Sequence, residues 1–316
     1  MARLLLGGLI ADRILKEIKQ EISSLNESGP FEPTLAVLQT GSHDDPDAYT
    51  RGQIRAADCS GIRLRRVTVS NVSSSEELVG QIAALNCDPS VHGITVQLPI
   101  IASGNFDTDE VLNAIDPNKD VDGLSTCQLA HICSGSYLRW KQCPFLIHPS
   151  CVAAACLLLL QETGPIPIGL RCLVVGRGRL VGTPVASLML RSANATTTIC
   201  HTGTRCLEEE VNRAEILITG VGKTNLVKGD WIRAGAIVID CGIDVSSGKV
   251  LGDVEFEKAV SRAAWITPVP GGVGPLTFAL LMRSTLNAAK RFHNLNDKVK
   301  NGALTLYNCS YEYTIN

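Results

Sequence analysis

Short β-branched runs alternate with amphipathic helices along most of this chain. Apolar residues between Leu9 and Leu25 recur at intervals of three and four, which predicts a first helix. The next expected elements are strands over 34–41, 63–69 and 92–99 and helices over 47–61 and from Ser74, where Ser74 and Glu77 suggest a capping box. Strands that alternate with helices form parallel βαβ units, so the chain is expected to be an α/β protein.

The second half repeats this alternation more densely. Helices are expected over 151–164, 182–192, 206–213 and 275–292, and strands over 171–176, 195–200, 215–220 and 236–242. Such a run is typical of a doubly wound nucleotide-binding domain. The stretch from 101 to 147 has little periodicity, so it is either a long functional connection or a boundary region.

Length and charge limit the classes of function. A chain of 316 residues with 45% apolar content can form two domains. A net charge of −2 gives no field that would recruit nucleic acid or an anionic membrane, so a small-molecule partner is favoured. The apolar run at the start is too short to span a membrane and is expected to form a strand and a helix.

The chain has 12 cysteines but no CxxC pair and no Cys/His cluster at zinc spacing, so no metal site is expected. Several lie singly in apolar or helical stretches and are expected to be reduced core thiols: Cys59, Cys87, Cys172, Cys200 and Cys241. Cysteines 127, 133, 143 and 151 lie in an irregular region, which leaves their state open. Reduced thiols indicate a reducing compartment.

A glycine-rich loop, "CLVVGRGRLVGTP", follows the strand that ends near Gly176. Gly176, Gly178 and Gly182 would let the backbone approach a pyrophosphate at a helix N-terminus, although a plain tight turn also fits this spacing. The next strand ends in "TICHTGT" without the acidic residue that holds the ribose hydroxyls of NAD. Arg177 and Thr202, with His201 or Arg205, could instead meet an added phosphate, which favours NADP.

Two further turns have unusual composition. "ITPVPGGVGPLT" (266–277) is rich in proline and glycine before a helix, which favours a rigid ligand loop over a purely structural turn. "DPNKDVDGL" (116–124) carries three carboxylates but lacks the register of a calcium loop. Either these acids are solvated or one of them hydrogen-bonds a polar ligand, and spacing alone favours solvated acids.

Tyr49 and Gln53 stand four residues apart in "AYTRGQIRAADCSGI" and share one face of the expected helix. Both can bind a substrate, but an amide carries no proton for acid or base chemistry near neutral pH. Arg51 and Arg55 point off this face and stay protonated, so they are poor bases.

Seven motifs in order resemble the methylenetetrahydrofolate dehydrogenase/cyclohydrolase family, from about residue 5 to 292: "AYTRGQ", "GITVQLPI", "KDVDGL", "VVGRGRLVGTP", "ICHTGT", "VKGDWIRAGAIVIDCGID" and "ITPVPGGVGPLT". The resemblance implies two αβα domains joined by helices, with folate in the cleft between them. It implies a folate-binding catalytic domain over 1–147 plus 276–292, a Rossmann-like NADP-binding domain over 148–275, and a tail over 293–316 outside the match. A cytoplasmic homodimer is also expected, the mitochondrial matrix being the less favoured compartment.

The resemblance also assigns residues. Catalytic roles fall to Tyr49, Gln53, Gln97 and Asp122, and the substrate would lie against Tyr49, Val96, Gln97, Leu98, Pro99, Asp122 and the loop Pro270, Gly271, Gly272, Val273 and Gly274. NADP would contact Gly176, Arg177, Gly178, Thr202 and Ile243. The implied reactions are oxidation of methylene-tetrahydrofolate to the methenyl form and hydrolysis of that form to 10-formyl-tetrahydrofolate.

Four positions depart from the family pattern. Gln53 replaces a lysine proposed to work in the hydrolytic step, His148 and Cys151 replace a threonine and a glycine, and Gly178 replaces a serine. The sequence therefore predicts an NADP-dependent dehydrogenase with weak or absent cyclohydrolase activity. The alternative is a catalytically silent relative that serves as a dimerisation or carrier module, as part of a longer synthetase chain.

Overall fold

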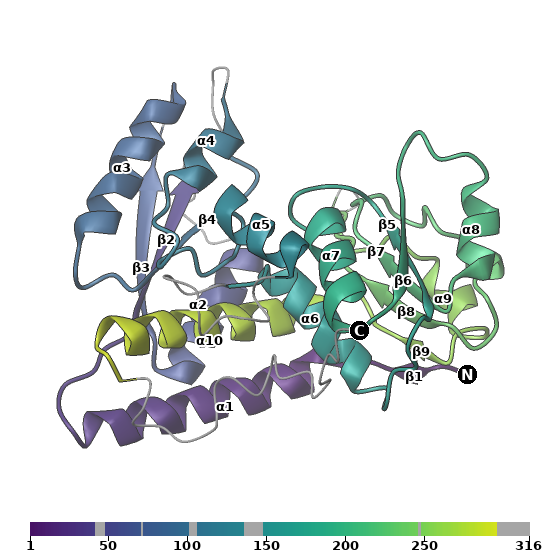
Figure 1. Cartoon of the computed structure of the whole chain (residues 1–316), viewed down its shortest axis with the longest axis horizontal. Helices are drawn as coiled ribbons and strands as arrows, with labels where there is room; N and C mark the ends of the chain where they lie inside the picture. Colours follow the sequence, from purple (N-terminus) through teal and green to yellow (C-terminus); the bar gives the residue numbers. More distant parts are fainter. Residues whose placement is uncertain (42–47, 71, 101–105, 136–147, 246–247, 296–316) are drawn as a thin grey trace, which may run out of the picture.

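The computed structural model describes residues 1–41, 48–70, 72–100, 106–135, 148–245 and 248–295. It contains two α/β domains that lie side by side (Figure 1). One is built on a three-stranded parallel sheet and the other on a six-stranded parallel sheet. The expected α/β fold with two domains is confirmed.

The first domain has the strand order β3-β2-β4. Its elements are β2 Thr34–Thr40, α2 Ala48–Ser60, β3 Arg63–Val69, α3 Ser75–Cys87, β4 Gly93–Val96, α4 Thr108–Asn113 and α5 Thr126–Ser134. All residues of β2 are buried because this strand is central and covered on both faces. β3 is an edge strand, and its residues are exposed or half-buried.

The second domain has the strand order β1-β9-β8-β7-β5-β6. Its elements are β1 Arg3–Leu4, α6 Cys151–Gln161, β5 Arg171–Val175, α7 Gly182–Ser192, β6 Thr196–Cys200, α8 Leu207–Arg213, β7 Ile216–Thr219, the 3₁₀ helix η2 Gly229–Trp231, β8 Ile237–Asp240, α9 Phe256–Ala259 and β9 Trp265–Ile266. The chain runs from β5 to β6 on one side and returns to β7 on the other. Ligands of open parallel sheets bind outside the carboxyl ends of the strands at such a switch point.

Two long helices, α1 Gly7–Asn26 and α10 Val273–Phe292, lie side by side beneath the first domain (Figure 1). Glu21 of α1 accepts hydrogen bonds from Arg283 at 2.6 Å and from Lys290 of α10, so these buried charges are paired. β1 precedes α1 but pairs with β9 of the second sheet. The two helices therefore tie the domains together.

The N-terminal apolar run forms β1 and the start of α1, as predicted. The buried face of α1 includes Ile14, Ile18 and Ile22, whereas Leu9 is 70% exposed and lies off this face. In the part of the chain that the structure describes, no helix combines the length and apolarity needed to cross a membrane.

The region expected to be irregular contains two helices within its described part. α4 begins after Asp107, whose carboxylate accepts hydrogen bonds from the amides of Asp109 and Glu110. α5 begins after Ser125, which caps the Gln128 amide, and ends at Gly135 with φ +73°. Both helices are too short for hydrophobic periodicity to be visible, but their capping residues were readable.

Two smaller expectations are wrong. α3 begins after Ser74, but Ser74 makes no side-chain cap bond; the Glu77 carboxylate instead accepts from the amide and hydroxyl of Ser73. Cys172 and Cys200 are buried core thiols, whereas Cys59 and Cys87 are exposed on the outer faces of their helices. The described cysteines are free thiols, and Cys143 lies outside the described residues.

Candidate functional site

Tyr49 and Gln53 lie one turn apart on α2, as predicted. The Tyr49 ring is 40% exposed and meets Phe278 of α10 edge to face, with ring centroids 4.9 Å apart. Gly52 allows this contact, because a Cβ there would stand 2.3 Å from the Phe278 ring. Gln53 is only 1% exposed, and its Oε1 has no hydrogen-bond partner among the described residues. A buried acceptor without a partner is costly, so this atom is suited to a water or a ligand N–H.

The segment after β4 carries the next predicted residues. The Gln97 amide donates to the Leu38 carbonyl at 2.8 Å, which extends the pairing of β4 with β2. The Thr50 hydroxyl of α2 donates to Gln97 Oε1 at 3.4 Å and so joins the two elements. Val96 is buried in the core, Leu98 is half-buried and Pro99 is exposed.

Asp122 is half-buried rather than fully solvated, so the arrangement favoured by its spacing does not hold for this residue. Thr95 of β4 donates to Asp122 Oδ2 at 3.0 Å. Burial, followed by the nearby Asp120 carboxylate, raises the pKa of Asp122 to about 6. Asp120 is fully buried and accepts hydrogen bonds from the amides of Gly123 and Ser125, which fixes this turn from inside.

His148 and Cys151 pack behind the Asp122 turn. A Cβ on Gly123 would lie 2.3 Å from the His148 carbonyl oxygen, so the two segments are in close contact. Burial lowers the pKa of His148 to about 3, and its Nε2 has no partner among the described residues. Burial also raises the pKa of the Cys151 thiol, which donates to the Val121 carbonyl at 3.5 Å. Both side chains are therefore neutral near pH 7.

The loop before α10 is a tight turn, as its proline and glycine content predicts. The Gly272 amide donates to the Pro268 carbonyl at 2.9 Å, and Gly271 has φ +109°. A Cβ on Gly272 would stand 2.6 Å from Thr267 Cβ, so only glycine fits there. Pro270 is exposed, Gly271 and Gly274 are half-buried, and Val273 begins α10, which carries Phe278 to Tyr49. The predicted substrate loop and the Tyr49 face thus adjoin through α10.

The glycine-rich loop occupies the switch point of the six-stranded sheet. Gly176 follows β5 with φ +119°, and a Cβ there would lie 2.9 Å from the Gly220 carbonyl after β7. A Cβ on Gly182, the first residue of α7, would lie 2.3 Å from the Gly176 carbonyl. Arg177 and Gly178 are exposed at the top of the loop. This close backbone approach beside a helix N-terminus fits a pyrophosphate.

The turn after β6 carries the exposed Thr202. The Nδ1 atom of His201 accepts from the Gly203 amide at 3.0 Å, so this ring nitrogen is used within the turn. Two carboxylates that the sequence analysis missed organise the neighbouring loops. Asp253 accepts from the amide of Val221, and Asp240 accepts from that of Gly242. Burial raises the pKa of Asp240 to about 6.

These two acids hold the loops that follow β7 and β8. Val221 and Ile243, on those loops, expose 44% and 56% of their surfaces. Apolar side chains presented beside the glycine-rich loop fit the flat ring of a dinucleotide. The structural role of Asp240 could have been predicted from the sequence, because an acid at the end of an apolar strand is rarely left unpaired.

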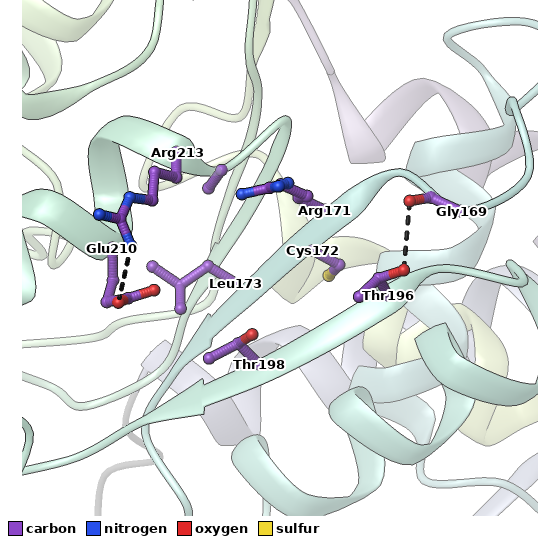
Figure 2. Close-up of a pocket in the computed structure, with 9 residues that line it drawn as sticks. Gly169, Arg171, Cys172, Leu173, Thr196, Thr198, Glu210 and Arg213 are labelled. Atoms are coloured by element: carbon purple, nitrogen blue, oxygen red, sulfur yellow. Dashed lines mark hydrogen bonds and ion pairs between the residues drawn. The ribbon is translucent and has the colours of Figure 1, made fainter.

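A separate cavity of about 370 Å³ lies at the amino ends of β5 and β6, opposite the glycine-rich loop. Figure 2 shows Arg171, Arg213 and Glu210 around it, with Thr196 and Thr198 of β6 along one side. None of the predicted site residues lines this cavity. Among the described residues, no group of three or more acidic, histidine or cysteine side chains could hold a metal ion.

Comparison with known proteins gives the family. Residues 5–122 match the model of the tetrahydrofolate dehydrogenase/cyclohydrolase catalytic domain, and residues 150–293 match that of the NAD(P)-binding domain. The cytoplasmic C-1-tetrahydrofolate synthase of Homo sapiens is 42% identical over 299 residues. That alignment covers 92% of this chain but 31% of the synthase, so the chain spans about a third of that relative. The bifunctional protein FolD of Moorella thermoacetica is also 42% identical, with 92% of this chain and 99% of FolD covered.

Solved structures agree with this assignment. The bifunctional FolD enzyme of Campylobacter jejuni superposes with a TM-score of 0.82 at 33% identity, covering 92% of this chain and 99% of that one. The FolD of Trypanosoma brucei, solved with NADP and an inhibitor, has a TM-score of 0.82 at 34% identity and covers 92% of this chain and 98% of that one. The chain belongs to the tetrahydrofolate dehydrogenase/cyclohydrolase family, with its catalytic domain first and its NAD(P)-binding domain second.

Proposed function

We propose that this protein binds NADP and oxidises methylene-tetrahydrofolate to methenyl-tetrahydrofolate, with hydrolysis of the methenyl product weak or absent. The observation that carries the proposal is Gln53: a buried, neutral amide at the position where the family pattern has lysine, one turn from a Tyr49 ring that is still exposed. The site keeps its means of holding a substrate, while position 53 lacks the proton carrier of the family pattern.

Substrate binding would use the first domain. Tyr49 offers an exposed ring for a flat pterin, Gln97 offers an amide, and Asp122 offers a carboxylate acceptor for ring N–H groups. The Pro270–Gly274 loop, with Leu98 and Pro99, would line the same face. The domain limits proposed from the sequence are 1–147 plus 276–292 for folate and 148–275 for NADP, but β1 at residues 3–4 pairs with the sheet of the second domain.

Cofactor binding would use the second domain. Gly176, Arg177 and Gly178 would hold the pyrophosphate and the added phosphate with Thr202, and Ile243 would lie beside the nicotinamide. The turn after β6, "CHTGT", offers hydroxyls and no carboxylate, which favours NADP over NAD. When bound, the nicotinamide supplies the hydride acceptor, so the protein has only to align two ligands.

Hydrolysis makes a different demand, because a water must be activated and a proton transferred. The Gln53 amide can orient a water through its free Oε1 but cannot exchange a proton at neutral pH. His148 is buried and neutral, and Cys151 retains its proton, so neither supplies the missing function. The second step is therefore expected to be slow.

The test is to follow the two steps separately. Purified protein is mixed with methylene-tetrahydrofolate and NADP, and NADPH and methenyl-tetrahydrofolate are recorded by absorbance. Hydrolysis is then measured by adding methenyl-tetrahydrofolate alone. Formation of methenyl product with hydrolysis no faster than in buffer is expected; rapid hydrolysis would contradict the role given to Gln53.

The second candidate function is a catalytically silent module for dimerisation or for carrying another domain. His148 and Cys151 favour it, because both side chains are larger than those of the family pattern and both are buried, with the Cys151 thiol against the Val121 carbonyl. The same assay separates the candidates. Methenyl product above the blank excludes a silent protein, whereas none at saturating substrate and NADP excludes the dehydrogenase.

A cytoplasmic homodimer completes the proposal. β6 is the last strand of its sheet and exposes Thr196, Thr198 and 42% of Ile199, so its free edge could pair with β6 of a second copy. Light scattering on Ile199→Pro tests this and should show half the mass, because the backbone of Thr196 and of Cys200 bonds towards β5, so the alternate Ile199 amide faces the free edge. The cysteines that the structure describes are free thiols, which agrees with a reducing compartment such as the cytoplasm.

The proposed tail, 293–316, lies almost wholly outside the described residues.

A further inference from the structure

Arg179 lies in the glycine-rich loop of the second domain but directs its guanidinium into the first domain. Its Nε donates to the Leu124 carbonyl at 2.8 Å, and its NH2 donates to the Thr126 hydroxyl at 3.2 Å. Its NH1 is paired with the Asp109 carboxylate of α4. One side chain thus contacts three positions across the domain boundary, and it is itself only 20% exposed.

The segment that Arg179 contacts is the one that carries Asp122. Leu124 is two residues beyond Asp122, and Thr126 is the first residue of α5. Asp120 holds the amides of Gly123 and Ser125 from inside the domain. Arg179, from the second domain, donates to the Leu124 carbonyl of the same turn. Residues 120–126 are therefore held between the Asp120 carboxylate of their own domain and the Arg179 guanidinium of the other.

The backbone of Arg179 belongs to the glycine-rich loop, which is held by hydrogen bonds of its own. The neighbouring Gly178 carbonyl accepts from the Thr183 amide at 3.1 Å, and the Leu180 carbonyl accepts from the Ser150 hydroxyl at 3.4 Å. Gly176 and Gly182 stand in backbone contact on either side. A pyrophosphate that binds this loop must order the short backbone from which Arg179 projects.

We propose that Arg179 is a positioning residue that couples cofactor binding to the folate side of the site, by fixing residues 120–126 when NADP orders the glycine-rich loop. Guanidinium geometry suits this task, because a planar fork can donate to a carbonyl, a hydroxyl and a carboxylate at once. The proposal rests on the proposed function for the identity of the folate. The cofactor part of it can be tested without any folate.

Amide hydrogen exchange of peptides covering 120–126 measures the effect directly. Saturating NADP should slow exchange there by about fivefold or more in the unchanged protein, the lower end of usual coupling. In Arg179→Ala the slowing should fall below about twofold. The calorimetric Kd for NADP should change little, because the guanidinium is bonded to the first domain. In Arg179→Lys it should be partial, since an ammonium cannot form the fork.

The matched control is Arg191→Ala. Arg191 also donates from Nε across the boundary, to the Cys133 carbonyl at 3.2 Å, but it lies on α7 away from the loop. This variant should keep the full response to NADP. An equal loss in both variants would mean that the domain contact in general carries the effect, and a full response in Arg179→Ala would mean that the residue plays no part; either result overturns the proposal.

A second readout uses 5-formyl-tetrahydrofolate as a non-reacting folate. NADP should tighten its binding in the unchanged protein, and Arg179→Ala should reduce that factor towards one. If NADP slows exchange through Arg179 but no folate binds, the proposed substrate is wrong and the coupling stands. If NADP does not bind at all, the proposed function and the coupling both fail.

Discussion

The first domain presents its side of the site as buried polar side chains, whereas the second presents backbone and exposed side chains. Gln53 is enclosed with an unpartnered oxygen, and burial raises the pKa of Asp122 to about 6. Across the boundary, Arg177 and Ile243 are exposed beside glycines where a Cβ would clash with neighbouring atoms. Proton transfer requires enclosed polar side chains, as in the first domain. Alignment of a dinucleotide requires an accessible backbone surface, as in the second domain. A single replacement in the first domain can therefore remove one reaction and spare the other.

The largest expected effect restores the proton carrier. Gln53→Lys should raise the rate of methenyl-tetrahydrofolate hydrolysis by about a hundredfold or more, since general acid–base groups usually contribute that much. The dehydrogenase rate should change far less. Hydrolysis is followed by the decay of methenyl absorbance. Gln53→Met, which has similar size and no ionisable proton, is the control and should leave hydrolysis unchanged. A gain in both variants would contradict the role given to the proton.

The next effect concerns the second domain. Arg177→Ala should weaken NADP binding by about tenfold, which corresponds to the loss of one exposed charge-assisted hydrogen bond. NAD binding should hardly change, because NAD lacks the added phosphate. Titration calorimetry with both cofactors provides the measurement. Arg205→Ala, a neighbouring exposed arginine, tests whether general positive charge is sufficient; an equal loss of NAD and NADP would remove the specific role of Arg177.

A smaller effect follows from the raised pKa of Asp122. The folded state holds this proton more tightly than the unfolded chain, whose carboxyl has the usual value of 3.8. Its contribution to stability is therefore present below about pH 4 and is lost as the pH rises through about 6. Asp122→Asn should remove this slope, which melting temperatures at pH 4 to 8 would show relative to the unchanged protein.

The same titration predicts a kinetic signature. Only the ionised Asp122 carboxylate offers full acceptor capacity to ring N–H groups, so KM for the folate should rise below about pH 6. In Asp122→Asn the KM should be higher and less dependent on pH. Asp116→Asn, in the same turn, is the control; a profile altered equally in both variants would assign the effect to the turn as a whole.

Much of the fold was predictable because its signals are local. β3 and α7 begin and end at the expected residues, since alternation and glycine punctuation lie within the segments themselves. α4 and α5 were missed because their stability comes from packing against other elements, and only their caps are visible in the sequence.

The site was less predictable for a related reason. Asp122 was expected to be solvated because Thr95 and Cys151, which enclose it, come from distant parts of the chain. The positions of Tyr49 and Gln53 on one helical face could be read directly. The contact of Arg179 with Leu124 could not, because nothing in "GRGRLVG" indicates which domain the side chain enters.

The smallest effect tests whether Tyr49 belongs to the substrate surface or only to the packing between α2 and α10. An edge-to-face pair contributes about 0.5–1.5 kcal/mol to stability, so Tyr49→Leu and Phe278→Leu should each lower the free energy of unfolding by a similar, small amount. Urea unfolding measures this. The KM for methylene-tetrahydrofolate should separate the variants: Tyr49→Leu should raise it several-fold more than Phe278→Leu, because the tyrosine is exposed and the phenylalanine is half-buried. Equal KM values would show that the tyrosine serves packing alone, and the surviving substrate surface of the first domain would then have to be sought at Gln97 and Asp122.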